Sequence, residues 1–283
     1  MGRPARSGRE APGPPPRGSE RLTTLRAVVE YDGTDFSGLQ FQPAVRTVAG
    51  ELENALSQLL GHRVKITAAG RTDAGVHATG QVVSFKTQAA FPFERLAIAL
   101  NSTLPKDVSV REVAIVDDAF SARFSAMERI YVYAIYNAPQ PSPLLARYAY
   151  QAWMPIDLDR FLEGARHLLG EHDFRSFCGM LPETGPTIRT VRSLTAGRRG
   201  EVIRVEIRAD GFLHRMVRTI VGTLAECGNG RRDPADIPRV LQARDRAAAG
   251  LTAPPQGLYL AGVRYKDGFD SFTEPPATSA FAT

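Results

Sequence analysis

The order of strand-like and helix-like segments repeats once along this chain, and that repetition restricts the folds open to it. Each half reads strand, helix, strand, strand, helix, strand, and the second half has one further short helix near residues 237–244. The first half has predicted strands at about residues 25–31, 64–69, 81–86 and 108–116 and predicted helices at 48–60 and 93–101. The second half has predicted strands at 130–136, 187–195, 201–209 and 257–265 and predicted helices at 158–169 and 212–226.

Capping residues mark the ends of two of these helices. Thr47 is placed as the N-cap of the first helix, and Gly61 follows its last turn. Asp157 and Gly170 have the corresponding positions around the first helix of the second half. These signals predict where the helices begin and end.

Two halves of this order predict an α+β protein. We expect two ferredoxin-like, RNA-recognition-like βαββαβ halves that form a mainly antiparallel sheet, with helices on one side and a cleft between the halves. Alternation along the strand at 201–209 places Arg204 and Arg208 on the face opposite Ile203. If the halves lie side by side, their uncovered faces form a platform that Arg204 and Arg208 would line.

Composition shifts suggest the domain boundaries. We expect an N-terminal domain over residues 22–118 and a C-terminal domain over residues 119–267. Residues 1–21 are rich in Pro, Gly and Arg and contain no apolar run, so they are expected to form a disordered basic tail rather than a secretory signal. Residues 268–283 are expected to form a second disordered tail.

Charge and cysteine content narrow the class of partner and compartment. The net charge of +5 and the pI near 9.4 fit an anionic partner such as nucleic acid. The two cysteines, Cys178 and Cys227, have no CxxC spacing, so we expect no disulfide framework and a location in the reducing cytoplasm. The five histidines lack metal-ligand spacing, and no run of 18 apolar residues occurs, so neither a metal site nor a membrane-spanning helix is predicted.

The segment GRTDAGVHA, starting at Gly70, is the strongest candidate for a reactive site. Asp73 follows Arg71 by two positions and is surrounded by Ala and Gly, which leaves room for a large substrate. A neighbouring guanidinium favours an ionised carboxylate, which can act as a nucleophile or a base. A salt bridge that only fixes a hairpin loop remains the alternative.

Two further segments carry candidate functional side chains. Arg218 lies at the margin of an apolar helix face, where its guanidinium can bind a carboxylate or a phosphate or simply remain exposed. Tyr131 and Tyr133 share one face of a strand, where an aromatic ring can stack on a nucleobase, although at least one of them is expected to be a core residue.

A phosphatase is a rival interpretation of the segment Tyr31–Thr34. Haloacid-dehalogenase-type phosphatases place an Asp two residues before a similar Asp-Gly-Thr, but here that residue is Glu30. No parallel βαβ repeat follows either. A turn that closes the first strand is therefore the preferred interpretation.

Together these segments resemble the tRNA pseudouridine synthase A family from about Leu25 to Tyr265. The matching segments are YDGTDFSG from Tyr31, TVAGELENAL from Thr47, GRTDAGVHATGQVVSF from Gly70, NSTLPKDV from Asn101, ARFSAMERIYVY from Ala122, HDFRSF from His172, GFLHRMVRTIVG from Gly211 and APPQGLYLAGVRY from Ala253. The chain departs from the family pattern at Leu39, where tryptophan is usual, in the loop Met180–Pro186 and in its long N-terminal extension.

The resemblance implies a cofactor-free isomerase that converts uridines at positions 38 to 40 of the tRNA anticodon stem-loop to pseudouridine. It implies a homodimer, with tRNA spanning both subunits. By the same resemblance Asp73 is the catalytic nucleophile or base, Arg218 is the arginine that pairs with it, and Tyr131 is the tyrosine that stacks on the base.

The resemblance also implies residues that bind the substrate. Leu258 corresponds to an apolar residue of the pocket, and Arg71 to a basic residue that binds RNA or helps to flip the base. His77, in the same motif as Asp73, is also expected to contact the substrate.

The reaction places demands that one carboxylate can meet. The C1′–N1 bond must break, the uracil must rotate and a C1′–C5 bond must form after the nucleotide leaves its stack. The carboxylate can attack C1′, take the C2′ proton or add to C6, and the sequence leaves these routes open. A catalytically silent RNA-binding protein built on the same platform remains the alternative from another functional class.

Overall fold

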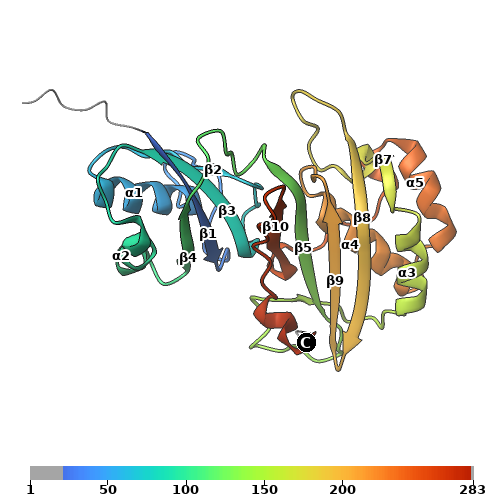
Figure 1. Ribbon diagram of the computed structural model, residues 1–283. Coiled ribbons are helices and arrows are strands. Elements are labelled where there is room, and N and C mark those ends of the chain that lie inside the picture. Colours follow the sequence, from blue (N-terminus) through green and yellow to red (C-terminus); the bar gives the residue numbers. More distant parts are fainter. Residues whose placement is uncertain (1–21, 282–283) are drawn as a thin grey trace, which may run out of the picture.

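In the computed structural model, which describes residues 22–281, ten strands form one sheet (Figure 1). Eight of them follow the order β4-β1-β3-β10-β5-β9-β8-β7, while β2 pairs with β3 and β6 with β5. The strands are β1 (Thr23–Tyr31), β2 (Thr67–Ala68), β3 (His77–Thr87), β4 (Val108–Ile115), β5 (Ala126–Tyr136), β6 (Tyr150–Gln151), β7 (Gly170–Asp173), β8 (Ile188–Arg199), β9 (Val202–Ala209) and β10 (Leu258–Tyr265). The α-helices are α1 (Val48–Leu60), α2 (Leu96–Thr103), α3 (Leu158–Arg166), α4 (Met216–Gly228) and α5 (Ile237–Ala243).

The two halves share this sheet through β10. The last strand of the C-terminal half lies between β3 and β5 (Figure 1). It pairs in parallel with β3 only at Tyr259 and Leu260 and runs antiparallel to β5 along most of its length. The expected α+β class, with a mainly antiparallel sheet, is confirmed.

The predicted helix caps are largely confirmed. The Thr47 hydroxyl accepts a hydrogen bond from the Gly50 amide at 3.2 Å, and Gly61 ends α1 with a left-handed φ of 72°. Asp157 caps α3 through the amides of residues 159 and 160. The prediction that Gly170 ends this helix was wrong, since α3 ends at Arg166 and Gly170 begins β7.

Helix α4 begins four residues later than predicted. The sequence predicted a helix from Phe212, but Arg215 has a left-handed backbone, with φ 58° and ψ 10°, and regular helix begins only at Met216. Non-glycine residues rarely adopt this conformation. The turn before the helix is therefore locally strained.

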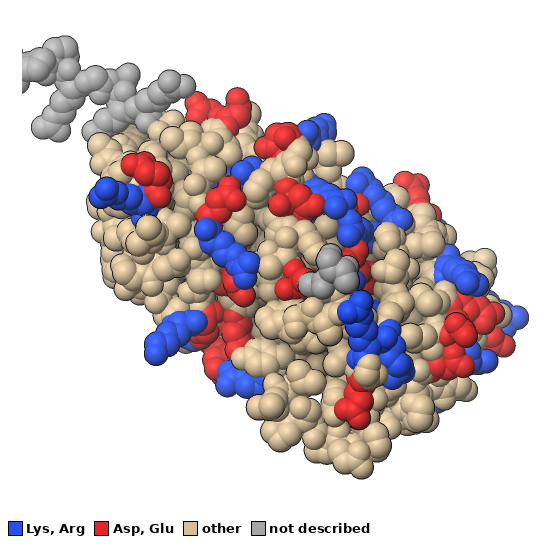
Figure 2. Space-filling view, turned by 60° about the horizontal axis from the view of Figure 1, so that its bottom comes forward, with Lys and Arg blue, Asp and Glu red and all other residues tan. Residues whose placement is uncertain are grey.

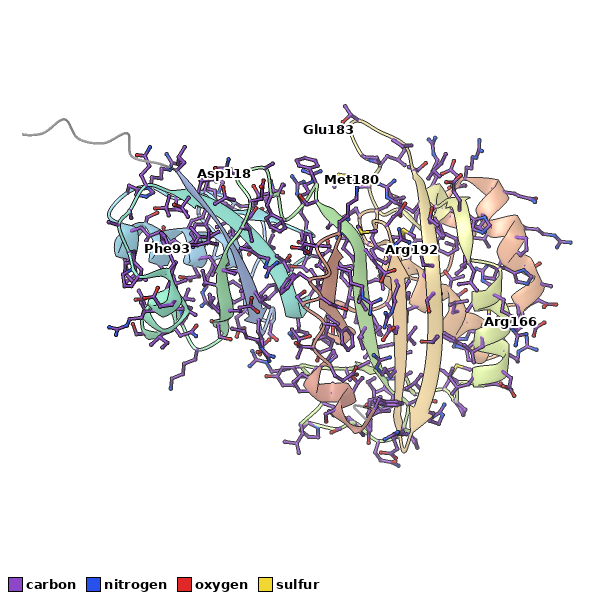
Figure 3. All side chains as sticks on the ribbon, in the orientation of Figure 1. Phe93, Asp118, Arg166, Met180, Glu183 and Arg192 are labelled. Atoms are coloured by element: carbon purple, nitrogen blue, oxygen red, sulfur yellow. The ribbon has the colours of Figure 1, made fainter. Side chains whose placement is uncertain are left out.

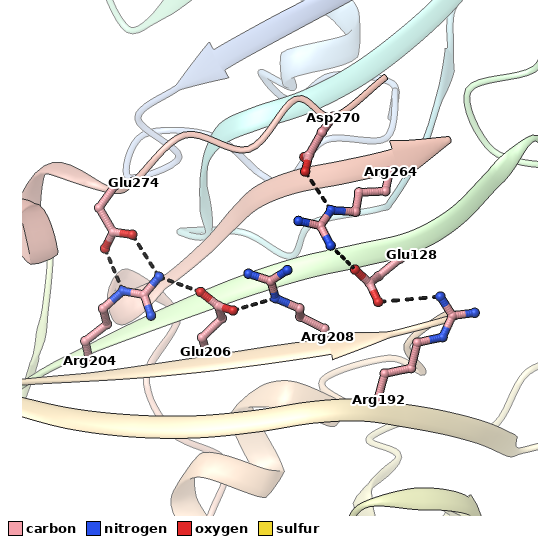
Figure 4. Close-up of polar contacts among 8 residues, drawn as sticks. All are labelled: Glu128, Arg192, Arg204, Glu206, Arg208, Arg264, Asp270 and Glu274. Atoms are coloured by element: carbon pink, nitrogen blue, oxygen red, sulfur yellow. Dashed lines mark hydrogen bonds and ion pairs between the residues drawn. The ribbon is translucent and has the colours of Figure 1, made fainter. Parts of the chain in front are cut away.

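The face opposite α4 carries a row of ion pairs. Ile207 pairs across from Tyr131 and belongs to the same core as α4, whereas Arg208 pairs across from Ile130 on the other face. On that face Arg204 binds both carboxylate oxygens of Glu274, at 2.7 and 2.8 Å, and Glu206 links Arg204 to Arg208 (Figure 4). Arg204 and Arg208 thus lie on the face opposite α4, as expected, and line a hollow there that is separate from the pocket of Asp73.

The C-terminal segment is packed against the sheet over its described part. The Ser271 hydroxyl donates a hydrogen bond to the Gly80 carbonyl at 2.7 Å, and the Thr79 hydroxyl donates to the Thr273 carbonyl at 2.6 Å. Thr278 is buried in the short 3-10 helix Pro276–Phe281. The prediction of a disordered tail at 268–283 was therefore wrong for residues 268–281. This segment is ordered because it forms hydrogen bonds with β3 and β10. The expected tail at 1–21 lies outside the described residues.

Within residues 22–281, no helix combines the length and apolar character needed to cross a membrane.

Candidate active site

A pocket of about 1140 Å³ lies where the two halves meet. Its walls come from α1, the loop between β2 and β3, β5, the turn before α4 and the start of β10. The loop after residue 179, where Figure 3 labels Met180 and Glu183, forms another part of the wall. Segments that are far apart in the sequence thus line the same pocket.

Hydrogen bonds to the N-terminal half fix the loop that carries Asp73. The Thr72 hydroxyl is 2.8 Å from the Tyr31 hydroxyl, and the Thr72 carbonyl accepts a hydrogen bond from the Leu39 amide at 3.1 Å. The Gln81 side chain donates to the Gly70 carbonyl at 2.8 Å. These bonds join the loop to the end of β1 and to β3, so its position is set by the N-terminal half.

Asp73 faces the pocket with basic side chains around it. Its side chain is 26% exposed, and its Oδ2 accepts a hydrogen bond from Nη1 of Arg218 at 2.9 Å. Nε2 of His214 lies 3.6 Å from Oδ1, and Nε of Arg215 lies 4.0 Å from Oδ2. The carboxylate is thus accessible from the pocket and lies close to three basic side chains.

Arg218 is held on two sides. It is 12% exposed, and its Nε donates to the Ala253 carbonyl at 2.8 Å while Nη1 donates to Asp73. The prediction that Arg218 lies at the margin of the helix face is confirmed, and its guanidinium is directed at the Asp73 carboxylate rather than into solvent.

Arg71 does not pair with Asp73. Its side chain is exposed and lines the pocket, whereas the basic side chains near the carboxylate all come from the turn before α4 and from α4 itself. The predicted neighbour in sequence was therefore the wrong ion-pair partner. Side chains two residues apart in a turn need not face each other.

Tyr131 lines the pocket from β5. It is 7% exposed, and its ring meets the ring of Phe212 edge to face, with centroids 4.9 Å apart. Burial, with the neighbouring Tyr31 and Asp73, raises the pKa of Tyr131 well above its usual value, so the phenol stays protonated. Tyr133 is the core tyrosine of the pair, and its hydroxyl donates to the Pro254 carbonyl at 2.7 Å.

The two other predicted binding residues differ in position, since one lines the pocket and the other is buried away from it. Leu258 lines the pocket at the start of β10. His77 does not: it is 2% exposed, stacks on Tyr259 with ring centroids 4.8 Å apart, and accepts a hydrogen bond from the Gly33 amide at 3.1 Å. Alternation at the start of β3 turns it away from the opening, so its expected role in substrate contact was wrong.

The segment Tyr31–Thr34 forms a turn and not a phosphatase site. Asp32 accepts hydrogen bonds from the amide and the hydroxyl of Thr34, at 3.0 and 2.5 Å. Burial alone would raise the pKa of Asp32, but these hydrogen bonds lower it below its usual value. β1 runs antiparallel to both of its neighbours, so the parallel repeat of a phosphatase is not formed here.

Several pocket residues were not identified as a site from the sequence. His214 and Arg215 were interpretable only as solvated or RNA-facing residues of a helix, and the left-handed backbone that turns them toward Asp73 gives no sequence signal. Exposed apolar side chains also line the opening, namely Phe41, Phe124, Met180 and Leu181. Their exposure depends on tertiary packing.

The pocket lining contains more basic than acidic side chains. Figure 2 shows one face on which Lys and Arg are interspersed with Asp and Glu. The pocket, in contrast, is lined by the arginines Arg71, Arg123, Arg129, Arg189 and Arg215 and by the acidic residues Glu53, Asp73 and Glu183. Local excess of guanidinium groups suits a phosphate backbone.

Neither cysteine is bridged, and both thiols are buried. Burial raises the pKa of Cys227 to about 11 and also raises that of Cys178. Among the residues that the structure describes, no three His, Cys, Asp or Glu side chains gather as metal ligands would.

Comparison with known proteins places the chain in one family. A family model described as tRNA pseudouridine synthase matches residues 27–125 and 165–266. tRNA pseudouridine synthase A of Brevibacillus brevis is 44% identical over 244 residues, which cover 86% of this chain and all of that protein. The proteins of the same name from Halalkalibacterium halodurans and Bacillus subtilis are 46% and 42% identical, over 81% and 85% of this chain and 88% and 98% of their own lengths. The chain therefore belongs to the tRNA pseudouridine synthase family, whose members are isomerases that convert uridine to pseudouridine.

Proposed function

We propose that this protein isomerises uridine to pseudouridine at positions 38 to 40 of the tRNA anticodon stem-loop, with Asp73 as the catalytic nucleophile or base. The observation that carries the proposal is the placement of the Asp73 carboxylate, 2.9 Å from Arg218 and open to a pocket that Tyr131 also lines. A flipped nucleotide entering this pocket would meet the carboxylate and an aromatic ring together.

Each pocket residue has a role that its position supports. Arg218 orients the Asp73 carboxylate, since it binds one carboxylate oxygen and a backbone carbonyl at once. Tyr131 stacks on or borders the extruded uracil, and Leu258 packs against it. Arg71, exposed at the opening, contacts the RNA backbone or helps to displace the base.

The chemistry needs one bond broken and one bond formed at C1′. The N1–C1′ bond breaks, the uracil rotates in the pocket, C5 bonds to C1′ and the C5 proton leaves. Asp73 can start the reaction by attack on C1′, by removal of the C2′ proton or by addition to C6. In each route the carboxylate must be ionised and unobstructed on the pocket side. Once Asp73 has released C1′ or C6, or returned the proton to C2′, its free carboxylate can accept the C5 proton with help from Tyr131, and N1 takes up one proton, so that the net change moves a proton from C5 to N1.

The setting of the reaction follows from the family resemblance. We propose that the protein acts on tRNA in the cytoplasm as a homodimer, with one tRNA contacting both subunits. The basic pI near 9.4 and the arginines of the pocket support an anionic partner of this size.

Asp73→Asn tests the proposal directly. This substitution keeps the shape of the side chain but removes its charge, so pseudouridine formation in a tRNA substrate should fall below detection. The affinity for tRNA should stay within about threefold of wild type, because most of that affinity comes from phosphate contacts. Pseudouridine mapping and a binding titration on the same tRNA measure both effects.

Asp159→Asn is the matched control, since Asp159 is exposed in the first turn of α3, which contributes no residue to the pocket. It should have wild-type activity. Pseudouridine formation by Asp73→Asn at the wild-type rate would refute the assignment of Asp73. A wild-type protein that binds tRNA but forms no pseudouridine would favour a silent RNA-binding protein instead.

A further inference from the structure

We infer that His214 is a positioning residue for this reaction, holding Oδ1 of Asp73 while Arg218 holds Oδ2. The inference rests on the proposed function and assigns a further residue to the same site. Nothing in the sequence motif distinguishes His214 from Arg215 beside it, and the assignment comes from its geometry.

The two oxygens of Asp73 have different partners. Oδ2 faces Nη1 of Arg218 at 2.9 Å and Nε of Arg215 at 4.0 Å. Oδ1 faces Nε2 of His214 at 3.6 Å. A carboxylate held at one oxygen can still rotate about its Cβ–Cγ bond, whereas contacts at both oxygens fix its plane. Of the three basic side chains near Asp73, only His214 faces Oδ1.

The surroundings of the imidazole select the tautomer. Nδ1 of His214 is buried and has no hydrogen-bond partner. A Cβ built on Gly179 would lie only 3.1 Å from Nδ1, so the backbone of Gly179 closes this side of the ring. A proton on Nδ1 would be buried without an acceptor, which is costly, so the proton belongs on Nε2, where Asp73 can accept it.

The backbone around His214 fixes its direction. The Gly179 amide donates to the His214 carbonyl at 2.8 Å, and Arg215 has the left-handed φ of 58°. A strained backbone conformation persists only where the surrounding structure enforces it, and such residues cluster at functional sites. Here the strained turn points two consecutive side chains, His214 and Arg215, at one carboxylate.

The contact of 3.6 Å is longer than a hydrogen bond, and we expect it to shorten when a nucleotide fills the pocket. Hydrogen bonds in active sites without substrate are commonly long and tighten in the complex. Because His214 acts through Asp73 and not on the RNA, its loss should lower kcat and leave KM nearly unchanged.

Three substitutions separate this role from a structural one. His214→Gln can place an amide N–H where Nε2 lies, His214→Asn is too short to reach Oδ1, and His214→Leu fills the space without a donor. The measurement is steady-state pseudouridine formation on a tRNA substrate, with kcat and KM determined for each variant, alongside thermal unfolding.

We expect His214→Asn and His214→Leu to lower kcat about tenfold or more, the effect of losing a hydrogen bond to a charged group, with KM within about twofold of wild type. His214→Gln should recover most of that loss. His167→Leu, at an exposed histidine that follows α3, is the matched control and should match wild type.

Three results would overturn the inference: full kcat in His214→Leu, a loss in His214→Gln as large as in His214→Leu, or a change confined to KM. A wild-type protein that forms no pseudouridine would instead refute the proposed function, and this inference with it.

Discussion

Arg218 occupies its position in the pocket because its guanidinium has two partners in different directions. Nε donates to the Ala253 carbonyl at 2.8 Å, and Nη1 donates to Asp73 at 2.9 Å. The planar fork of arginine can make both bonds without rotation, which a lysine ammonium on a flexible stem cannot do. The orientation of the guanidinium, and not only its charge, should therefore matter.

Arg218→Lys tests this orientation. The positive charge is kept, but at most one of the two bonds can form at a time, so we expect pseudouridine formation to fall by about tenfold to a hundredfold, as for a lost charge-assisted hydrogen bond. Affinity for tRNA should change little. Single-turnover pseudouridine formation, measured with enzyme in excess, isolates the effect from product release. Equal rates in Arg218→Lys and wild type would show that charge alone suffices.

The same residues show what sequence can and cannot predict at this scale. Asp73 and Arg218 were both identified as candidates, but their pairing spans 145 positions and could be obtained only from the family resemblance. Without that resemblance, Arg71 was the expected ion-pair partner of Asp73, because the two residues are only two positions apart. His214 was missed as a partner of Asp73 because a left-handed turn at Arg215 determines its direction, and no residue pattern announces that turn.

At the scale of elements, the starts and ends of regular structure differ in how well they are encoded. α1 was predicted with its true bounds because Thr47 and Gly61 supply local capping chemistry. The two-residue strands β2 and β6 and the short β7 were missed or overextended because they exist only through pairing with neighbouring strands. His77 was likewise misplaced, since which face a strand's first residue takes depends on register.

His77 makes the junction of β1 and β3 sensitive to pH. Its Nδ1 accepts a hydrogen bond from the Gly33 amide at 3.1 Å, which leaves the proton on Nε2 to be donated to the Arg147 carbonyl at 3.0 Å. Burial lowers the pKa of His77 below its usual 6.5, although Asp32, 3.2 Å from Nδ1, opposes the shift. The unfolded chain therefore takes up a proton at this site at a higher pH than the folded one does.

The free energy of unfolding should consequently decrease as the pH falls from 7.5 through 6.5 toward 5, because the unfolded state binds more protons in this window. His77→Gln cannot titrate and should show a shallower decrease, even if it is less stable at every pH. Urea unfolding at several pH values measures both slopes, and the other four histidines are common to both proteins. Parallel slopes would contradict the assignment to His77.

At the scale of the whole molecule, the pocket depends on how the two halves are joined. Besides β10, the segment after it connects them: the Ser271 hydroxyl donates to the Gly80 carbonyl in β3 and accepts from the Val263 amide in β10, at 2.7 and 2.9 Å. Gly80 permits this approach, since a Cβ there would lie 2.5 Å from the Ser271 carbonyl oxygen. This connection could not be predicted from the sequence, because the segment lacks strand or helix periodicity.

Ser271→Ala should weaken this connection. Two buried backbone groups, one in each half, would lose their partner, so we expect the free energy of unfolding to decrease by about 1–3 kcal/mol. Ser102→Ala is the matched control, because its hydroxyl is exposed on α2 and bonds only within that helix, to the Ala99 carbonyl at 2.7 Å. Urea unfolding of both variants measures the difference.

If the segment joins the halves, Ser271→Ala should also lower pseudouridine formation without any change in the pocket residues, because Asp73 comes from one half and Arg218 from the other. Equal stability of the two variants would show that the hydrogen bonds of the Ser271 hydroxyl do not help to hold the halves together.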